Sequence, residues 1–235
     1  MQAVILAAGM GKRLRPLTLK TPKPLLPVAG RPIIDWTLDN LPKGIDEIIL
    51  VVNYLEEQIR EHVGTDSKGR PVRYLTHQTL NGTAGALRVC QNYLRGRFLV
   101  LNGDDLYSAA DLSALIRHKM AVLVSPITQH AERLGLCTID QKGCLKGIAE
   151  KGSEEHARLV KSGECLINCG AYVLDERFFR VEPVKLPNGE FGLPQTLVQL
   201  VKQDVQIDLV QAQEWWPIGT PAELARARLR FTTQV

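Results

Sequence analysis

The chain has 235 residues, 45% of them hydrophobic, which is enough for the packed core of one large α/β domain. The formal net charge at pH 7 is only +4, and the basic residues gather in the first loop instead of forming long tracts, so we expect no nucleic-acid partner. No apolar run approaches the roughly 18 residues of a membrane span, and the short apolar N-terminal stretch has no positive charges before it, so we expect a cytoplasmic protein with no membrane partner.

Strand-like and helix-like segments alternate through the first half. Short apolar runs bounded by turn residues are typical of buried parallel strands, and they lie at residues 2–7, 47–52, 72–75 and 98–101. The segments between them have helical patterns, at residues 32–41, 54–63 and 83–94. This order predicts a doubly wound arrangement with a parallel sheet.

The second half is less regular. Further strands are predicted at residues 121–127, 166–174 and 205–210, an antiparallel hairpin at 136–139 and 145–149, and helices at 193–202 and 221–231. We therefore predict a single α/β domain over residues 1–235. Its sheet would be Rossmann-like, doubly wound and mixed but mainly parallel, with a small antiparallel insertion. A ligand would bind at the carboxyl ends of the parallel strands.

The cysteines indicate buried thiols. There are five, an odd number, and no two form a Cys-x-x-Cys pair, which argues against a zinc knuckle and against a complete disulfide framework. We expect reduced, mostly buried side chains at Cys90, Cys137, Cys144, Cys165 and Cys169.

The loop after the first strand is the most informative segment. Residues 8–28 are rich in glycine, lysine and arginine and are stiffened by prolines. Glycines admit phosphates close to backbone N–H groups, and cations neutralise their charge. The loop therefore predicts a polyphosphate site.

Two better-known phosphate loops do not fit this segment. A Walker A loop requires a glycine where Leu6 or Ala7 stands, and a Ser or Thr where Arg13 stands. The dinucleotide fingerprint begins well at Gly9 and Gly11, but Leu14 occupies its third glycine position. Neither a P-loop NTPase nor a nicotinamide cofactor is indicated.

The remaining pattern resembles the opening of the sugar-1-phosphate nucleotidylyltransferases. Residues 6–18 match Leu-Ala-Ala-Gly-x-Gly-x-Arg-Leu-x-Pro-Leu-Thr at every fixed position, and Pro22-Lys23-Pro24-Leu25 completes the family motif. The resemblance implies that residues 1–120 form a nucleotide-binding half and residues 121–235 a sugar-binding half. It also implies two substrates, an NTP and a sugar 1-phosphate, and Mg²⁺ as the cofactor. The sequence leaves a homo-oligomer open.

The resemblance assigns roles along the first loop. Arg13 and Lys23 match the family's basic residues at the triphosphate, and we expect both to be catalytic. Leu6, Ala8, Gly9 and Gly11 would bind the nucleotide, chiefly through backbone donors and clearance.

A second landmark follows the strand at 98–101. Asn102-Gly-Asp-Asp105 ends that strand, and Asp104 matches the family's magnesium aspartate. A carboxylate there can hold Mg²⁺ against the α-phosphate. We predict Asp104 as both a catalytic residue and the metal ligand.

A third segment, residues 77–86, resembles the family's base-binding stretch. Gly82 and Thr83 open a helix there and would approach the base. The family's glutamine is displaced by one position in this chain, so either His77 or Gln78 could face the base.

Four residues resemble the sugar-phosphate site. Glu150-Lys151 corresponds to the family's Glu-Lys-Pro, and Asn168-Cys-Gly-Ala-Tyr172 to its Asn-x-Gly-x-Tyr. Glu150 would accept from sugar hydroxyls, Lys151 would bind the phosphate, and Asn168 would add an amide contact. Gly135 would let the backbone touch the sugar.

Two departures stand against these matches. The family commonly has a second magnesium aspartate in Trp-x-Asp-x-Gly-Thr, where this chain has Pro217, a residue that cannot coordinate a cation. Phosphates and waters could complete the metal site, or Asp105 or Glu214 could substitute, or turnover could be impaired. The family's Thr-Asp is also changed, to Pro194-Gln195.

The function that the sequence favours is Mg²⁺-assisted, in-line transfer of a nucleotidyl group from an NTP to a sugar 1-phosphate, with release of pyrophosphate. Two alternatives stay open: a catalytically impaired NDP-sugar sensor, motivated by Pro217, and a CTP-dependent cytidylyltransferase acting on an alcohol phosphate. The sequence names neither the base nor the sugar.

Overall fold

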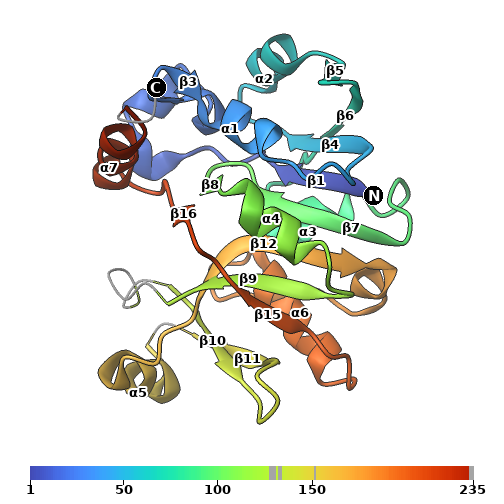
Figure 1. Cartoon of the computed structure of the whole chain (residues 1–235), viewed down its shortest axis with the longest axis vertical. Coiled ribbons are helices and arrows are strands. Elements are labelled where there is room, and N and C mark those ends of the chain that lie inside the picture. Colours follow the sequence, from blue (N-terminus) through green and yellow to red (C-terminus); the bar gives the residue numbers. More distant parts are fainter. Residues whose placement is uncertain (127–130, 132–133, 151, 233–235) are drawn as a thin grey trace.

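The computed structural model describes residues 1–126, 131, 134–150 and 152–232. At its centre is a ten-stranded sheet, of which eight strands have the order β11-β10-β12-β7-β1-β4-β6-β5 (Figure 1). The other two branch from this order: β9 pairs with β12, and β15 pairs with β9. The strands of this sheet are β1 (Gln2–Leu6), β4 (Glu47–Val52), β5 (Asp66–Ser67), β6 (Arg70–Thr76), β7 (Arg97–Asn102), β9 (Ala121–Ser125), β10 (Leu136–Ile139), β11 (Leu145–Ala149), β12 (Ile167–Asp175) and β15 (Asp208–Gln211).

The sheet is mixed. Strands β6, β4, β1 and β7 run parallel, as do β9 and β15, whereas β12 pairs antiparallel with both β7 and β9, and β10 and β11 form an antiparallel hairpin. Three two-stranded ladders lie outside the sheet: β2 (Pro27–Val28) with β3 (Arg31–Pro32), β8 (Leu106–Tyr107) with β16 (Trp215–Trp216), and β13 (Val184–Lys185) with β14 (Phe191–Gly192). The predicted α/β fold with a mixed, partly parallel sheet is confirmed.

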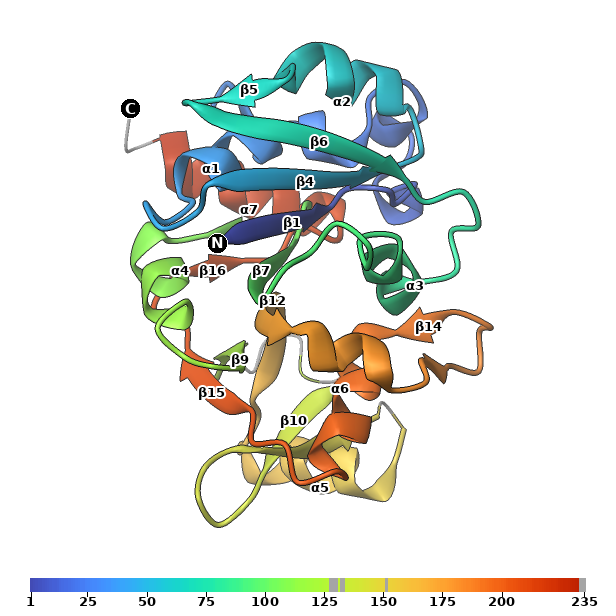
Figure 2. The same ribbon diagram turned by 90° about the vertical axis from the view of Figure 1, so that its right-hand side faces the viewer.

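Helices cover both faces of the sheet because the buried strands are apolar on both sides (Figure 2). Alternate residues of each strand point to opposite faces, so Ile5 and Leu50 pack with the helices of one face, and Val4 and Val51 with those of the other. The first face carries α1 (Ile33–Asp39), α2 (Glu56–Val63) and α4 (Ala109–Leu115); the second carries α3 (Thr83–Arg88) and α6 (Leu193–Val201). Helices α5 (Glu154–Ser162) and α7 (Pro221–Thr232) complete the fold.

Some predicted element bounds were wrong. Helix α3 ends at Arg88 instead of residue 94, because the chain tightens into a turn in which Cys90 N–H bonds to the carbonyl of Leu87, three residues back. Strand β15 begins at Asp208 rather than at residue 205. Strand β9 ends at Ser125, and residue 127 lies outside the described residues.

Helices α4 and α5 were not predicted. Each is short and is preceded by a serine whose side chain accepts a hydrogen bond from the backbone N–H three residues further along: Ser108 from Asp111 N–H, and Ser153 from His156 N–H. Such caps satisfy backbone donors at the helix start.

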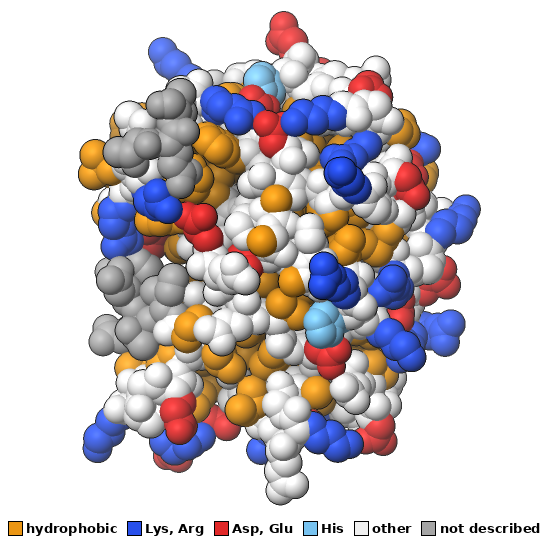
Figure 3. Space-filling model, in the orientation of Figure 1, with side chains coloured by type: hydrophobic (Ala, Val, Ile, Leu, Met, Phe, Trp, Pro, Cys, Tyr) orange, Lys and Arg blue, Asp and Glu red, His pale blue; other side chains and the backbone are white. Residues whose placement is uncertain are grey.

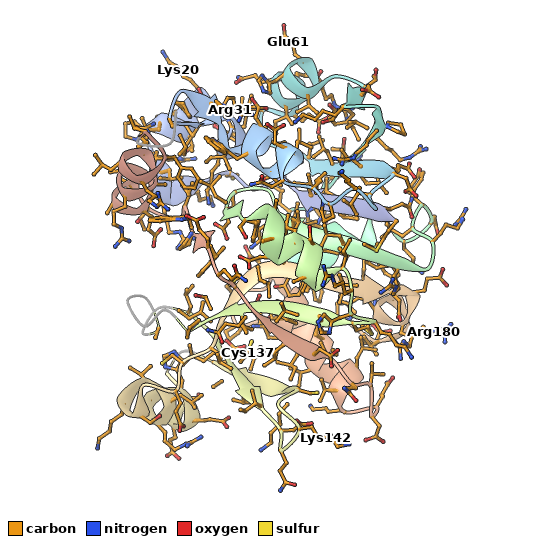
Figure 4. All side chains as sticks on the ribbon, in the orientation of Figure 1. Lys20, Arg31, Glu61, Cys137, Lys142 and Arg180 are labelled. Atoms are coloured by element: carbon orange, nitrogen blue, oxygen red, sulfur yellow. The ribbon has the colours of Figure 1, made fainter. Side chains whose placement is uncertain are left out.

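The surface carries charges of both signs, and the cysteines are buried. On the face in Figure 3, lysine and arginine side chains lie in small groups with acidic side chains among them. All five cysteines are buried and free, and Cys137 lies among the side chains of the lower part of the molecule (Figure 4). Burial raises the pKa of Cys90 and of Cys137 to about 12. Within the described ranges, no helix has the length and apolar character needed to cross a bilayer.

Candidate active site

Strand register brings the two sequence landmarks together. Parallel strands β1 and β7 are neighbours, with Leu6 opposite Asn102, so the loop after β1 and the Gly-Asp corner after β7 leave the sheet at the same edge. Gly103 N–H donates to the carbonyl of Leu6 at 2.9 Å. A Cβ on Gly103 would lie 3.0 Å from that oxygen, so glycine permits this close approach.

The first loop is folded tightly on itself. Gly11 has φ +60°, and a Cβ there would come within 2.8 Å of the Thr18 side chain. The Thr18 hydroxyl donates to the Gly11 carbonyl at 2.8 Å, and the Tyr54 hydroxyl donates to the Thr18 carbonyl at 2.9 Å. These bonds fix the path of the chain between Gly9 and Lys23.

A cleft of about 470 Å³ opens at this edge of the sheet. Its volume is in the range of small-ligand sites. The sequence-predicted residues that line it are Leu6, Ala8, Gly9, Gly11, Arg13, Lys23, His77, Gly82, Thr83 and Asp104. The roles given to them remain predictions, but the structure brings them to one cavity.

Lys23 and Asp104 meet directly in the cleft. Lys23 Nζ lies 2.5 Å from Asp104 Oδ2, an ion pair between residues 81 positions apart. The Lys23 side chain is only 7% exposed, whereas that of Asp104 is 40% exposed. The cation is therefore held in place, while the carboxylate still reaches solvent and any ligand.

Arg13 faces the C-terminal part of the chain. A Cβ on Gly219 would lie 3.2 Å from Arg13 Nη2 and 3.2 Å from Glu223 Oε2. Gly219 N–H donates to that Glu223 oxygen at 2.7 Å, and Glu223 is buried. Sequence reasoning missed Gly219 and Glu223. The signal was the capping pattern Thr220-Pro-Ala-Glu223, in which Thr220 Oγ1 accepts from Glu223 N–H.

On the side predicted to hold the base, the structure brings only one of the two alternatives to the cleft. His77 is 3% exposed and lines the cavity, and its Nε2 lies 2.8 Å from Asn81 Oδ1. Gln78 is exposed and is not among the lining residues, so the structure does not support its prediction. A turn begins at Gln78, and spacing in the sequence alone did not indicate which of the two side chains would face the cleft.

Gly82 and Thr83 join the cleft to the β13–β14 hairpin. Gly82 has φ +100°, and a Cβ there would lie 2.5 Å from the carbonyl oxygen of Phe191. The Thr83 hydroxyl accepts from Leu193 N–H at 3.0 Å, so this side chain anchors the start of α6. The hairpin also contributes Glu190 to the lining, a residue for which sequence reasoning predicted no role.

Asp105 is turned away from the cleft. Its Oδ1 accepts from Ile218 N–H at 3.1 Å and its Oδ2 from Trp215 Nε1 at 3.4 Å, so it anchors the segment that contains Pro217. Burial, with a further contribution from the neighbouring Asp104 carboxylate, raises the pKa of Asp105 to about 7. The suggestion that Asp105 replaces the missing metal ligand is not supported, because both of its oxygens are engaged elsewhere.

Glu214 is also remote from the cleft. It lines a separate cavity of about 240 Å³ together with Trp36, Trp216 and Phe231. Its Oε1 accepts from Trp216 Nε1 and from Arg230 Nη2, each at 3.3 Å. Glu214 therefore does not substitute for the missing aspartate either.

Asp104 and Glu190 contribute the carboxylates among the residues that line the cleft, and Asp104 is the one predicted to bind a metal ion. Among the described residues, no three His, Cys, Asp or Glu side chains are grouped so that they could hold a metal ion. Mg²⁺ commonly takes only one or two protein carboxylates and fills its remaining positions with phosphates and water. Asp104 therefore fits a Mg²⁺ ion whose remaining ligands come from the nucleotide phosphates and from water.

Of the predicted sugar residues, the three that the structure describes, Gly135, Glu150 and Asn168, are not among those that line the cleft. Glu150 Oε1 accepts from Gln195 Nε2 at 2.7 Å, and a Cβ on Gly135 would lie 3.9 Å from Glu150 Oε2. Asn168 is committed to local bonds: its Oδ1 accepts from Gly170 N–H, and its Nδ2 donates to the Tyr172 hydroxyl, both at 2.8 Å. Lys151 lies outside the described residues.

Comparison with solved structures agrees with this fold. A Bacillus anthracis protein described as a glucose-1-phosphate thymidylyltransferase superposes with a TM-score of 0.81 at 24% identity, covering 99% of this chain and 95% of that one. A UDP-glucose pyrophosphorylase from Acinetobacter baumanii gives a TM-score of 0.79 at 20% identity, covering 99% and 93%. At these identities the likeness establishes the fold alone.

Sequence relatives extend over the whole chain. The bifunctional protein GlmU of Methanocaldococcus jannaschii is 30% identical over 229 residues, 97% of this chain but 53% of that protein, so the chain spans about half the length of such relatives. The UTP–glucose-1-phosphate uridylyltransferase AglF of Haloferax volcanii is 29% identical over 248 residues, 100% of this chain and 99% of that protein. The nucleotidyl transferase family model matches residues 2–234. The chain therefore belongs to the nucleotidyl transferase family, among the sugar-1-phosphate nucleotidylyltransferases.

Proposed function

We propose that this chain transfers a nucleotidyl group from an NTP to a sugar 1-phosphate, forming an NDP-sugar and releasing pyrophosphate. The observation that carries the proposal is the convergence of Arg13, Lys23 and Asp104 on one cleft. The 2.5 Å contact between Lys23 and Asp104 supports a shared role at the triphosphate.

The proposed reaction requires the two anionic substrates to be aligned with each other, and it does not require a group that removes a proton. A sugar phosphate oxygen is largely anionic near pH 7, so it can attack the α-phosphorus without a general base. A new bond forms between that oxygen and the α-phosphorus. The bond from the α-phosphorus to the oxygen that bridges it to the β-phosphate breaks, and pyrophosphate leaves with the electron pair of that bond. Arg13 and Lys23 would stabilise this leaving group and hold the triphosphate in line.

Asp104 is the residue that would hold Mg²⁺ together with the nucleotide. Bound there, the ion would neutralise charge on the phosphates at the reacting centre. Asp104 is suited to this role because its side chain is 40% exposed at the cleft.

We assign the two substrates to the two halves of the chain. Residues 1–120 would bind the nucleotide, with the base near His77 and Gly82, and residues 121–235 would bind the sugar phosphate through Glu150 and Asn168. Lys151 would contribute its charge to the phosphate. The name of one full-length relative supports a hexose 1-phosphate, since AglF is a UTP–glucose-1-phosphate uridylyltransferase.

The test is a panel of all common NTPs against several sugar 1-phosphates with Mg²⁺, read as pyrophosphate release and as NDP-sugar formation. We expect turnover with at least one hexose 1-phosphate. Turnover with phosphocholine or another alcohol phosphate, and with no sugar 1-phosphate, would overturn the assignment in favour of a cytidylyltransferase.

A second candidate function has one observation in its favour. Pro217 stands where the family commonly has its second metal carboxylate, and Asp105 and Glu214 are both bonded outside the cleft. A chain with an incomplete metal site could bind NDP-sugars as a sensor. Tight NDP-sugar binding in calorimetry, with no turnover in the panel, would favour the sensor.

A further inference from the structure

One hydrogen bond joins two segments at the predicted sugar site. Gln195 Nε2 donates to Glu150 Oε1 at 2.7 Å. Gln195 lies in the first turn of α6, and Glu150 directly follows β11, a strand against which α6 packs. Only the nitrogen of the amide can donate to a carboxylate, so this contact fixes which end of the amide faces Glu150.

The other end of the same amide is unfavourably placed. Within the part of the chain that the structure describes, Gln195 Oε1 is buried and has no hydrogen-bond partner. It lies against the backbone of Gly192, where a Cβ would come within 1.9 Å of it. Burying an unpaired acceptor is destabilising, so fold stability does not explain this side chain. The same packing directs Nε2 toward Glu150.

The start of α6 is anchored to the cleft. Leu193 N–H donates to Thr83 Oγ1 at 3.0 Å, and Thr83 lines the cleft. One residue beyond Gln195, Thr196 Oγ1 accepts from Val184 N–H at 3.0 Å. The backbone that carries Gln195 therefore has a set position relative to the nucleotide side of the site.

We propose that Gln195 is a positioning residue, which orients the Glu150 carboxylate toward the hydroxyl groups of the sugar. The inference rests on the proposed function. With Oε1 engaged by Gln195, Glu150 keeps Oε2 as the acceptor for a hydroxyl. Gly135 has no side chain to fill the space beside that oxygen, because a Cβ there would lie 3.9 Å from it.

Gln195→Leu tests this inference, because it removes the donor with little change in size. We expect the KM for the sugar 1-phosphate to rise about fivefold to tenfold, as for the loss of one hydrogen bond, with kcat and the KM for the NTP within about twofold of wild type. Thermal stability should be unchanged or higher, since the buried unpaired oxygen is removed. Gln199→Leu, on the same helix, is the matched control and should leave all these values unchanged.

A double-mutant cycle with Glu150→Ala, which removes the acceptor of this hydrogen bond, tells whether Gln195 acts through Glu150. In the Glu150→Ala background, Gln195→Leu should change the KM for the sugar 1-phosphate less than about twofold. An equal rise in both backgrounds, or an unchanged KM in Gln195→Leu alone, would overturn the inference while leaving the proposed function intact. A wild-type protein without turnover on any sugar 1-phosphate would overturn both.

Discussion

Two regions of the molecule are built in different ways. The phosphate-loop region, residues 9–23 with Asp104, is held by strand register and by close backbone approaches such as Gly103 to Leu6. The Glu150 region, formed by Gly135, Glu150, Asn168 and Gln195, depends on bonds between side chains. The first region follows the family motif closely, whereas the second departs from it at Pro194-Gln195.

The difference has a physical cause. A register between central strands cannot shift without moving their side chains to the wrong face of the sheet. A pair of side chains can change one member at a time, at a cost of roughly 1 kcal/mol per hydrogen bond. The phosphate-loop region is therefore suited to the reaction steps that all substrates share. The Glu150 region is suited to the recognition of one particular sugar.

The largest effect is expected in the phosphate-loop region. Lys23→Met should lower kcat about 100-fold to 1,000-fold, because it removes a buried cation that, under the proposed function, would stabilise the leaving pyrophosphate. Steady-state pyrophosphate release with the preferred substrate pair measures this. Lys20→Met is the matched control, since Lys20 belongs to the same loop but points outward (Figure 4). Similar rates for both variants would show that the ion pair with Asp104 has no catalytic role.

The contact between Gly82 and the β13–β14 hairpin, which lies outside both regions, gives the next effect. Gly82→Ala should lower the free energy of unfolding by about 2 to 4 kcal/mol, because its φ is +100° and the new Cβ would lie 2.5 Å from the Phe191 carbonyl oxygen. Urea unfolding measures the loss. Gly189→Ala is the control for backbone strain alone, since Gly189 has φ +86° and no atom within 4 Å of the added Cβ. If both variants lost the same stability, the Phe191 contact would be unimportant.

A smaller effect is expected at Pro217, which stands where the family commonly has its second metal carboxylate. Pro217→Asp should lower the Mg²⁺ concentration for half-maximal activity by about threefold to tenfold, since it restores a second carboxylate. Pro217→Ala controls for the loss of the proline ring and should leave the Mg²⁺ dependence unchanged. If the aspartate variant matched the alanine variant, Asp104 with phosphates and water would suffice as the ion's ligands.

The sequence predicted the phosphate-loop region better than the Glu150 region. Strand periodicity and motif spacing placed Lys23 after the first predicted strand and Asp104 after the fourth, and the parallel pairing of these strands in the structure brings the two residues to one edge. Spacing could not tell which of His77 and Gln78 faces the cleft, because that depends on the direction of a loop. Nor could it show that Asp105 is buried against Ile218, 113 residues away.

The second half was harder to predict because its contacts depend on tertiary structure. Gln195 and Glu150 are 45 residues apart and meet only when α6 packs on β11. The short helices α4 and α5 have few turns over which a periodic pattern could be recognised. Their serine caps were the available signal.

The smallest predicted effect concerns acid stability of the second half. Asp208, on β15, accepts from His118 Nδ1 at 2.7 Å and from Gln206 Nε2 at 3.0 Å. These hydrogen bonds hold the pKa of Asp208 below its usual value of 3.8, and the bond with His118 contributes most. A depressed carboxyl pKa stabilises the fold above the ordinary pKa, and the stabilisation is lost as the pH falls through the lowered value. The contribution should be less than about 1 kcal/mol, because both side chains are about one third exposed.

Asp208→Asn should therefore flatten the acid limb of the stability curve. Between pH 5 and pH 3, urea unfolding should show a smaller loss of stability in the variant than in wild type. Asp140 Oδ1 accepts from backbone N–H groups of its own turn, so Asp140→Asn changes a carboxylate of the same half without touching His118. Parallel acid limbs in wild type and Asp208→Asn would mean that His118 and Asp208 contribute nothing. A flattening confined to Asp208→Asn would assign this acid sensitivity to β15, which pairs with β9, and so to the half of the molecule that carries Glu150.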